Sequence, residues 1–124
     1  MTRINVVPVE ELTREHLVAE YKELPRVFGL VRSAIERGEM PNDKRNPDTY
    51  RLGSGHVRFF YPRLGFIVER HKKLVDEMLK RGYVVNYPEP PNHDIGQEWF
   101  GNYSATQDAL EENRNRIAER LLKT

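Results

Sequence analysis

Residues 13–37, TREHLVAEYKELPRVFGLVRSAIER, predict the main helical element of this chain. The apolar residues that recur there at three- and four-residue spacing are Leu17, Tyr21, Leu24, Phe28, Val31 and Ile35. That spacing is typical of a helix with one face against a core. Thr13 suits the N-cap and Gly38 the position after the last turn. Pro25 lacks a backbone donor, so we expect the helix to kink there.

Two further helices are predicted later in the chain. The second should begin near Pro62, whose missing N–H costs nothing in a first turn, and should stop at Gly82. Its expected inward residues are Leu64, Ile67, His71, Leu74, Val75, Met78 and Leu79. The third should start after Ser104 or Thr106 and run to about Leu122. Its expected inward residues are Leu110, Asn113, Ile117 and Leu121.

The segments between these helices, residues 38–61 and 83–101, are rich in proline and other turn formers. No repeat or low-complexity linker divides the chain, and 124 residues suit one domain with a real core. We therefore predict an all-α fold: a single compact domain over 1–124, with three helices, long ordered loops and little or no sheet. Phe59, Phe60 and Tyr61 are expected in the core, and Trp99 is expected to pack a loop.

Charge is balanced in sum but not along the chain. There are 20 Lys and Arg against 19 Asp and Glu, giving a net charge of +1. The segment between Lys44 and Lys80 has many more bases than acids, and the acids concentrate elsewhere, in Glu10–Glu23 and Asp108–Glu119. Such asymmetry can place a positive face on a near-neutral protein and would suit a polyanion partner, although a scattered basic surface is an equally good interpretation.

Several classes of protein are excluded or disfavoured by composition. No stretch approaches the roughly 20 apolar residues that a membrane span requires, so we expect no membrane association. The absence of cysteine excludes disulfides and thiolate zinc sites. The N-terminus, MTRINVVPVEEL, lacks an apolar secretory core, so a cytoplasmic, intracellular protein is expected.

Thr2 is the first candidate for chemistry. It follows Met1, and a small second residue is the condition under which the initiator is normally removed, which leaves an α-amine on Thr2. An α-amine has a reference pKa of about 7.7–8.0, against about 10.4 for lysine, so much of it is neutral and nucleophilic near neutral pH. A neighbouring cation such as Arg3 would lower that pKa further. The alternative is an ordinary frayed terminus.

A second candidate group lies on the first helix. His16, Glu20 and Glu23 fall on one stripe by their four- and three-residue spacing, with Lys22 and Arg26 beside it. Glu23 precedes the Leu24-Pro25 kink, and a carboxylate there could accept and return protons while nearby cations hold phosphates. The alternative is a solvated face with local ion pairs.

Neither the glycine-rich stretch nor the histidines form a recognised site. Gly53-Ser54-Gly55-His56 lacks the lysine–hydroxyl pair and the strand-to-helix context of a phosphate-binding loop. His56 is as consistent with a core or loop-anchoring role as with a functional one. The four histidines, His16, His56, His71 and His93, show no metal-ligand spacing, so we predict no metal and no cofactor.

These features together resemble a known family. MTRIN at the terminus, HLVAEYKELPRVFG in the first helix, LGSGHVRFFYPRLGF in the middle and KRGY after the second helix resemble the pyrimidine-dimer DNA glycosylases, also called phage-type endonuclease V. The resemblance covers most of residues 1–83 and continues weakly through Gln97-Glu98 and Gly101-Asn102-Tyr103. The run EYKELPRVFG is long and unusual in composition, which makes the resemblance specific.

The resemblance implies a structure and a mechanism. The N-terminal segment is expected to thread between helices to reach the active site. The Thr2 amine is expected to attack C1′ of the damaged nucleotide, displacing the base and forming an imine, and Glu23 to assist the proton transfers of the following β-elimination. The family kinks DNA and flips a base. Positions matching its DNA contacts are Arg3, His16, Arg26, Arg116 and Arg120.

The sequence also departs from the family. Lys22 stands where the family pattern has an arginine, which keeps the charge but loses bidentate contact. The tryptophan- and tyrosine-rich tail that touches the lesion in the phage enzyme has no counterpart before Thr124. The expected function is therefore glycosylase and abasic-site lyase activity on pyrimidine dimers in duplex DNA, by a monomer without an obligate protein partner. The same chemistry on another damaged base, a catalytically silent DNA-binding module and a small helical interaction protein remain alternatives.

Overall fold

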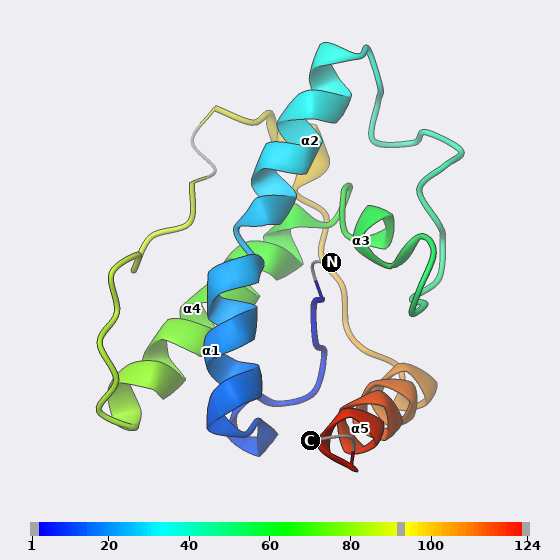
Figure 1. The fold of residues 1–124 in the computed structure, drawn as a ribbon. Coiled ribbons are helices and arrows are strands. Elements are labelled where there is room, and N and C mark those ends of the chain that lie inside the picture. The colour runs from blue at the N-terminus through cyan, green and yellow to red at the C-terminus, as the bar shows by residue number, and fades with distance from the viewer. Residues whose placement is uncertain (1–2, 92–93, 123–124) are drawn as a thin grey trace.

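The computed structural model describes residues 3–91 and 94–122, and the chain is helical (Figure 1). The helices are α1 Arg14–Glu23, α2 Arg26–Glu36, α3 His56–Phe59, α4 Leu64–Lys80 and α5 Gln107–Leu122, with 3₁₀ turns at Val9–Glu11 and Gln97–Trp99. The described residues contain no strand beyond an isolated bridge between Arg63 and Phe100. No helix in this part of the chain is both long and apolar enough to cross a bilayer. The all-α prediction is confirmed.

The predicted first helix is divided in two at Pro25. Helix α1 ends at Glu23 and α2 begins at Arg26, so the prediction of one kinked helix is wrong. Pro25 has no N–H to donate back into α1. The chain between the two helices instead makes a 3₁₀-type hydrogen bond, in which Val27 N donates to the Leu24 carbonyl three residues earlier at 3.1 Å. The break leaves Glu23 as the last residue of α1.

The helix boundaries follow the predicted capping signals closely. The Thr13 hydroxyl accepts the His16 amide at 3.4 Å, and the Thr106 hydroxyl accepts an amide three residues further on at 3.1 Å. Gly38 and Gly82 follow α2 and α4 with φ of 86° and 83°, the left-handed conformation that ends a helix and favours glycine.

Two elements differ from the sequence prediction. Helix α4 begins at Leu64 with Arg63 at its N-cap, two residues later than the start expected at Pro62. The segment expected to be a loop contains the short helix α3, which begins at His56 after Gly55, a glycine with φ of 85°. This single turn places His56 and Phe59 in the interior.

The core lies where α1 packs against α4, and it includes the buried faces of α2 and of the N-terminal segment (Figure 1). Phe59, Phe60, Tyr61 and Trp99 are buried, as predicted. The predicted inward positions that are exposed instead are Ile35 at 39%, Leu79 at 58% and Leu121 at 44%. Each of these residues lies in the final turn of its helix, past the part of the apolar stripe that other elements cover.

The N-terminal segment threads between helices, as the resemblance implied. Residues 3–7 run between α1 and α5 (Figure 1). Their backbone is held by buried side chains rather than by a strand: Ile4 N donates to His56 Nε2 at 2.9 Å, and Val6 N donates to Asn113 Oδ1 at 2.7 Å. Because buried amides must find acceptors, these side chains determine the path of the segment.

Candidate active site

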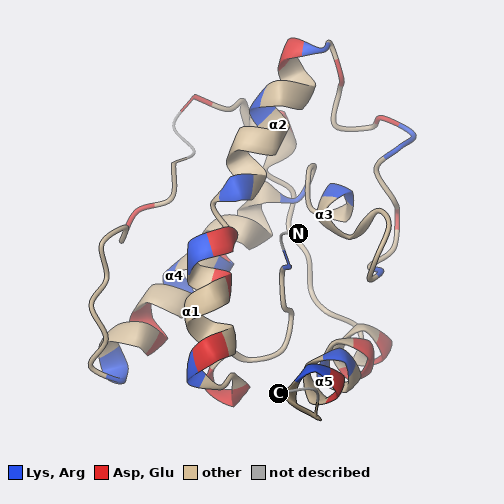
Figure 2. Cartoon of the chain, viewed as in Figure 1, with Lys and Arg blue, Asp and Glu red and all other residues tan. Residues whose placement is uncertain are grey.

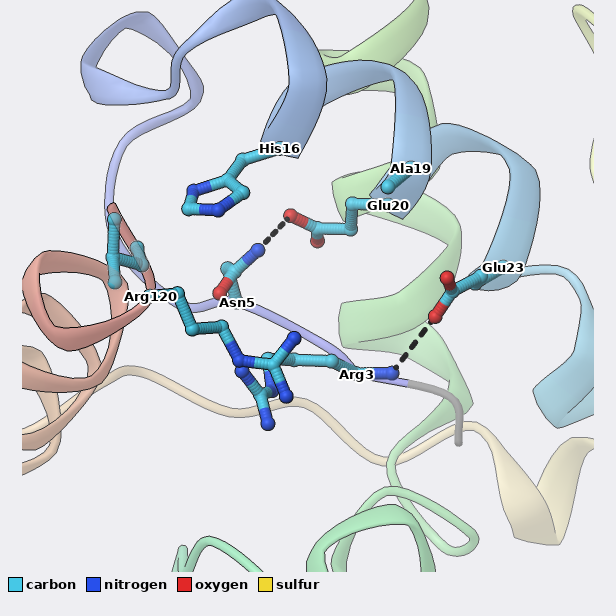
Figure 3. Close-up of a pocket in the computed structure, with 8 residues that line it drawn as sticks. Arg3, Asn5, His16, Ala19, Glu20, Glu23 and Arg120 are labelled. Carbon is cyan, nitrogen blue, oxygen red and sulfur yellow. Dashed lines mark hydrogen bonds between the residues drawn. The ribbon is translucent and has the colours of Figure 1, made fainter. Parts of the chain in front are cut away.

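A small pocket of about 80 Å³ opens between the N-terminal segment, α1 and α5 (Figure 3). Its polar lining comes from Arg3, Asn5, His16, Glu20, Glu23 and Arg120. The structure therefore brings together four of the site residues predicted from sequence, which come from opposite ends of the chain. Thr2, the predicted nucleophile, lies outside the described residues.

Glu23 lies at the end of this pocket where the described chain begins. The backbone N–H of Arg3 donates to Glu23 Oε1 at 3.3 Å (Figure 3). Glu23 also lines a second depression on the outer side of α1, so its partly buried carboxylate is accessible from two directions. A carboxylate in such a position can exchange protons with a bound molecule.

Glu20 has a different environment although it shares the stripe with His16 and Glu23. It is 2% exposed, and its two oxygens accept from Arg70 Nε at 2.8 Å and Arg70 Nη2 at 3.0 Å. It also accepts from Asn5 Nδ2 at 2.9 Å. The carboxylate is saturated by internal partners, which makes Glu23 the better candidate for proton transfer.

Guanidinium groups gather on the side of the pocket opposite α1. Arg3 and Arg120 lie close together in Figure 3, and Arg116 is on the same helix one turn before Arg120. Burial and the nearby charges of Arg120 and Arg116 lower the pKa of Arg3. Among the described residues Arg3 Nη1 has no hydrogen-bond partner although it is buried. An unpaired buried donor among like charges suits an anion such as a phosphate.

Lys22 and Arg26 lie in the second depression rather than in the pocket. They line it with Arg14 and share Glu23 with the pocket. In the ribbon of Figure 2, Lys and Arg positions are coloured where α1 meets α2 and along α5. Arg3, His16 and Arg120 at the pocket and Lys22 and Arg26 at the second depression thus form two adjoining groups that meet at Glu23.

Several arginines of the basic segment between Lys44 and Lys80 pair within the protein, whereas lysines such as Lys72 and Lys73 are exposed. Arg58 donates to Glu39 at 3.1 Å, and Arg45 donates to Asp43 at 2.9 Å. Arg70 is 4% exposed and bonded to Glu20. These arginines hold loops and the core together, so the linear charge asymmetry overstates the positive charge that a partner could meet.

Two residues of this region were not identified as functional from the sequence. His56 holds Ile4, and Arg70 donates to the Val7 carbonyl as well as to Glu20. Arg70 had a recognisable signal, since it is a charged residue between Ile67 and Leu74 on the apolar stripe of α4. His56 follows Gly53-Ser54-Gly55, and nothing in that stretch indicates that the His56 ring would bond to Ile4.

A family model described as pyrimidine dimer DNA glycosylase matches residues 1–89. The match includes the N-terminal segment, Glu23, the Pro25 break, His56 and α4, and it ends before α5. Since it covers well over half of the 124 residues, the chain belongs to the pyrimidine dimer DNA glycosylase family of DNA-repair enzymes.

Proposed function

We propose that this protein is a bifunctional DNA glycosylase and abasic-site lyase, acting on cyclobutane pyrimidine dimers in duplex DNA through the α-amine of Thr2. The observation that carries the proposal is the hydrogen bond from the Arg3 backbone to the Glu23 carboxylate. Thr2 is covalently bonded to Arg3, so the chain leads directly from this bond to the proposed nucleophile.

The reaction needs an amine, one carboxylate and no cofactor. The amine attacks C1′, the bond from C1′ to the base breaks, and the base takes a proton as it leaves. The nitrogen then loses a proton while the C1′–O4′ bond breaks and O4′ takes a proton, which opens the sugar and gives the imine; the imine acidifies the 2′ hydrogen. Glu23 accepts that proton, the C3′–O bond breaks to release the 3′ phosphate, and water then hydrolyses the imine to restore the amine.

The surrounding cations support both binding and chemistry. Positive charge near an amine favours its neutral form, so Arg3 and the α5 arginines would increase the nucleophilic fraction of Thr2. The same side chains would hold DNA phosphates on either side of the reacting sugar, together with His16, Lys22 and Arg26. Salt-dependent phosphate contacts would supply most of the affinity.

Imine trapping tests the proposal directly. The protein is incubated with duplexes that contain a pyrimidine dimer, an abasic site or no damage, and borohydride is added to reduce any imine. We expect a covalent adduct with the first two duplexes and none with the third. An adduct with the abasic duplex alone would indicate that the glycosylase acts on a damaged base other than a pyrimidine dimer. Binding to damaged DNA without any adduct would indicate a catalytically silent DNA-binding module.

The nucleophile is tested by blocking the amine. A chain whose N-terminus is acetylated should bind damaged DNA but give no trapped adduct, because an amide nitrogen does not form an imine. The matched control is the same chain carried through the procedure without the acetylating reagent. Strand cleavage that survives the block would show that Thr2 is not the nucleophile.

A further inference from the structure

His56 lies inside the protein, away from the walls of the pocket, and touches the segment that carries the proposed nucleophile. It begins α3, is 2% exposed, and is surrounded by the rings of Tyr50 and Phe60 with ring-centre distances of 5.7 Å. Its Nε2 accepts from Ile4 N at 2.9 Å, and its Nδ1 is 2.8 Å from the Arg51 carbonyl oxygen.

These two hydrogen bonds define the protonation state of the ring. A backbone amide can only donate, so Nε2 must be unprotonated to accept from Ile4. A carbonyl oxygen can only accept, so Nδ1 must carry the hydrogen that it donates to Arg51. Both bonds exist together only in the neutral ring with hydrogen on Nδ1.

We propose that His56 is the positioning residue for the N-terminal nucleophile: its neutral ring fixes the Ile4 amide and thereby sets where the chain emerges beside Glu23. This inference rests on the proposed function. Ile4 is two residues from Thr2, and its hydrogen-bond partner His56 belongs to α3. The next two residues of the segment are held by other helices: Asn5 donates to Glu20 on α1, and Val6 donates to Asn113 on α5. The Arg3 amide donates to Glu23 itself, so His56 supplies the next anchor behind that contact.

The electrostatic surroundings favour the neutral ring. Burial lowers the pKa of His56, and the charges of Arg3 and Arg116 lower it further, while the Arg51 carbonyl and Glu20 act in the opposite direction. Tyr50 and Phe60 add uncharged ring surface. If Nε2 took up a proton, it would become a second donor facing the Ile4 N–H, and the hydrogen bond between them would be lost. We therefore expect acid to release the N-terminal segment from α3.

Two substitutions separate the bond to Ile4 from the rest of the side chain. His56→Gln extends an amide oxygen to about the place of Nε2 and can accept from Ile4 without titrating. His56→Asn ends one atom earlier, so it can still donate to Arg51 but cannot reach Ile4. His71→Asn is the matched control: His71 is also fully buried, but its Nε2 contacts the Tyr87 carbonyl at 2.9 Å, away from the N-terminal segment.

The experiment measures the trapping rate and the protection of the Ile4 amide in each protein, with affinity for damaged DNA as a third readout. We expect His56→Asn to lose about 10²-fold in trapping rate, the scale of a displaced reacting group, with DNA affinity nearly unchanged. The Ile4 amide should exchange faster in this variant. His56→Gln should restore both values to within a few fold. Its trapping should fall less steeply on the acid side than that of the natural protein, because only protonation of the amine, and not release of Ile4, then contributes to the fall. His71→Asn should leave the trapping rate unchanged.

The outcomes distinguish this inference from the proposed function. If the natural protein traps DNA and His56→Asn traps it equally fast, the positioning role is refuted and the lyase proposal stands. If the natural protein traps nothing, the lyase proposal fails, while Ile4 exchange still reports whether His56 anchors the segment. A loss of trapping equal in His56→Asn, His56→Gln and His71→Asn would reduce His56 to a general structural role and overturn the inference.

Discussion

At the scale of single residues, Glu23 and Glu20 differ by environment rather than by chemistry. Both are on α1, but Glu20 is closed off by Arg70 and Asn5, whereas Glu23 meets the Arg3 amide and the pocket. A glutamate therefore stabilises the structure at position 20, whereas a glutamate three residues later, at position 23, is available for proton transfer. The sequence placed them on one stripe, and only their partners separate their roles.

Glu23→Gln should uncouple binding from cleavage. The amide keeps the size of the side chain and can still accept from the Arg3 amide, but it cannot take the 2′ proton. We expect affinity for damaged duplex to change by less than a few fold and strand cleavage to fall by about 10²–10⁴-fold. Gel-shift and single-turnover cleavage assays check this. Unchanged cleavage would remove Glu23 from the mechanism.

His56 should also leave a signature in stability against pH. Its pKa is lowered in the folded state, so the unfolded chain takes up the proton first as pH falls. The contribution to stability is therefore complete above the ordinary pKa of about 6.5 and is lost progressively below it, down to the lowered folded pKa, by at most about 1.4 kcal/mol per pH unit. Urea unfolding between about pH 7.5 and 5.5 should show this decline.

The matched variant for that measurement is His56→Gln, which does not titrate. Its free energy of unfolding should decline less over the same range, and the difference between the two curves isolates the histidine. Parallel curves for the two proteins would mean that the folded and unfolded chains bind the His56 proton equally well.

At the scale of elements, the approach of α4 to the segment before α5 depends on a missing side chain. A Cβ added to Gly65 would lie 2.8 Å from the Gly101 carbonyl oxygen and 2.9 Å from that of Phe100. Both are backbone atoms, which cannot rotate away. The Gly101 amide also donates to the Pro62 carbonyl at 3.0 Å, so this contact links the start of α4 to the chain leading into α5.

Gly65→Ala should therefore destabilise the protein by about 1–3 kcal/mol through overpacking. Gly29→Ala is the matched control, because Gly29 is exposed within α2 and a Cβ there meets nothing within 4 Å. Alanine in an open helical position should stabilise by about 0.5–1 kcal/mol. Opposite signs in chemical denaturation would bear out this account, and equal destabilisation by both variants would contradict it.

At the scale of the whole molecule, a net charge of +1 conceals an uneven surface. Many arginines between residues 44 and 80 are paired internally, whereas Arg3, Arg116 and Arg120 gather at the pocket and Lys22 and Arg26 at its neighbour. A localised group of cations attracts DNA and releases condensed counterions when it binds.

DNA affinity should accordingly fall with salt, and Arg120→Ala should lower the slope of log K against log salt by about 1 while weakening binding to all sequences alike. Lys72→Ala is the control: Lys72 is an exposed lysine on α4 that lies outside the residues lining the pocket and its neighbour. Fluorescence anisotropy over a salt series measures both. An unchanged slope for Arg120→Ala would exclude Arg120 from phosphate contact.

The sequence by itself determined the three long helical segments, their caps at Thr13, Gly38 and Gly82, and the family, because these depend on local spacing and on contiguous motifs. It also placed Glu23 beside the Pro25 break. It did not predict α3, or the division of the first segment into α1 and α2. The tertiary structure alone decided that Glu20 pairs with Arg70, that His56 accepts from Ile4, and that α5 brings Arg120 to the same pocket as Arg3. These contacts join residues 50 to more than 100 positions apart, and no periodicity along a chain encodes which buried polar groups meet when it folds.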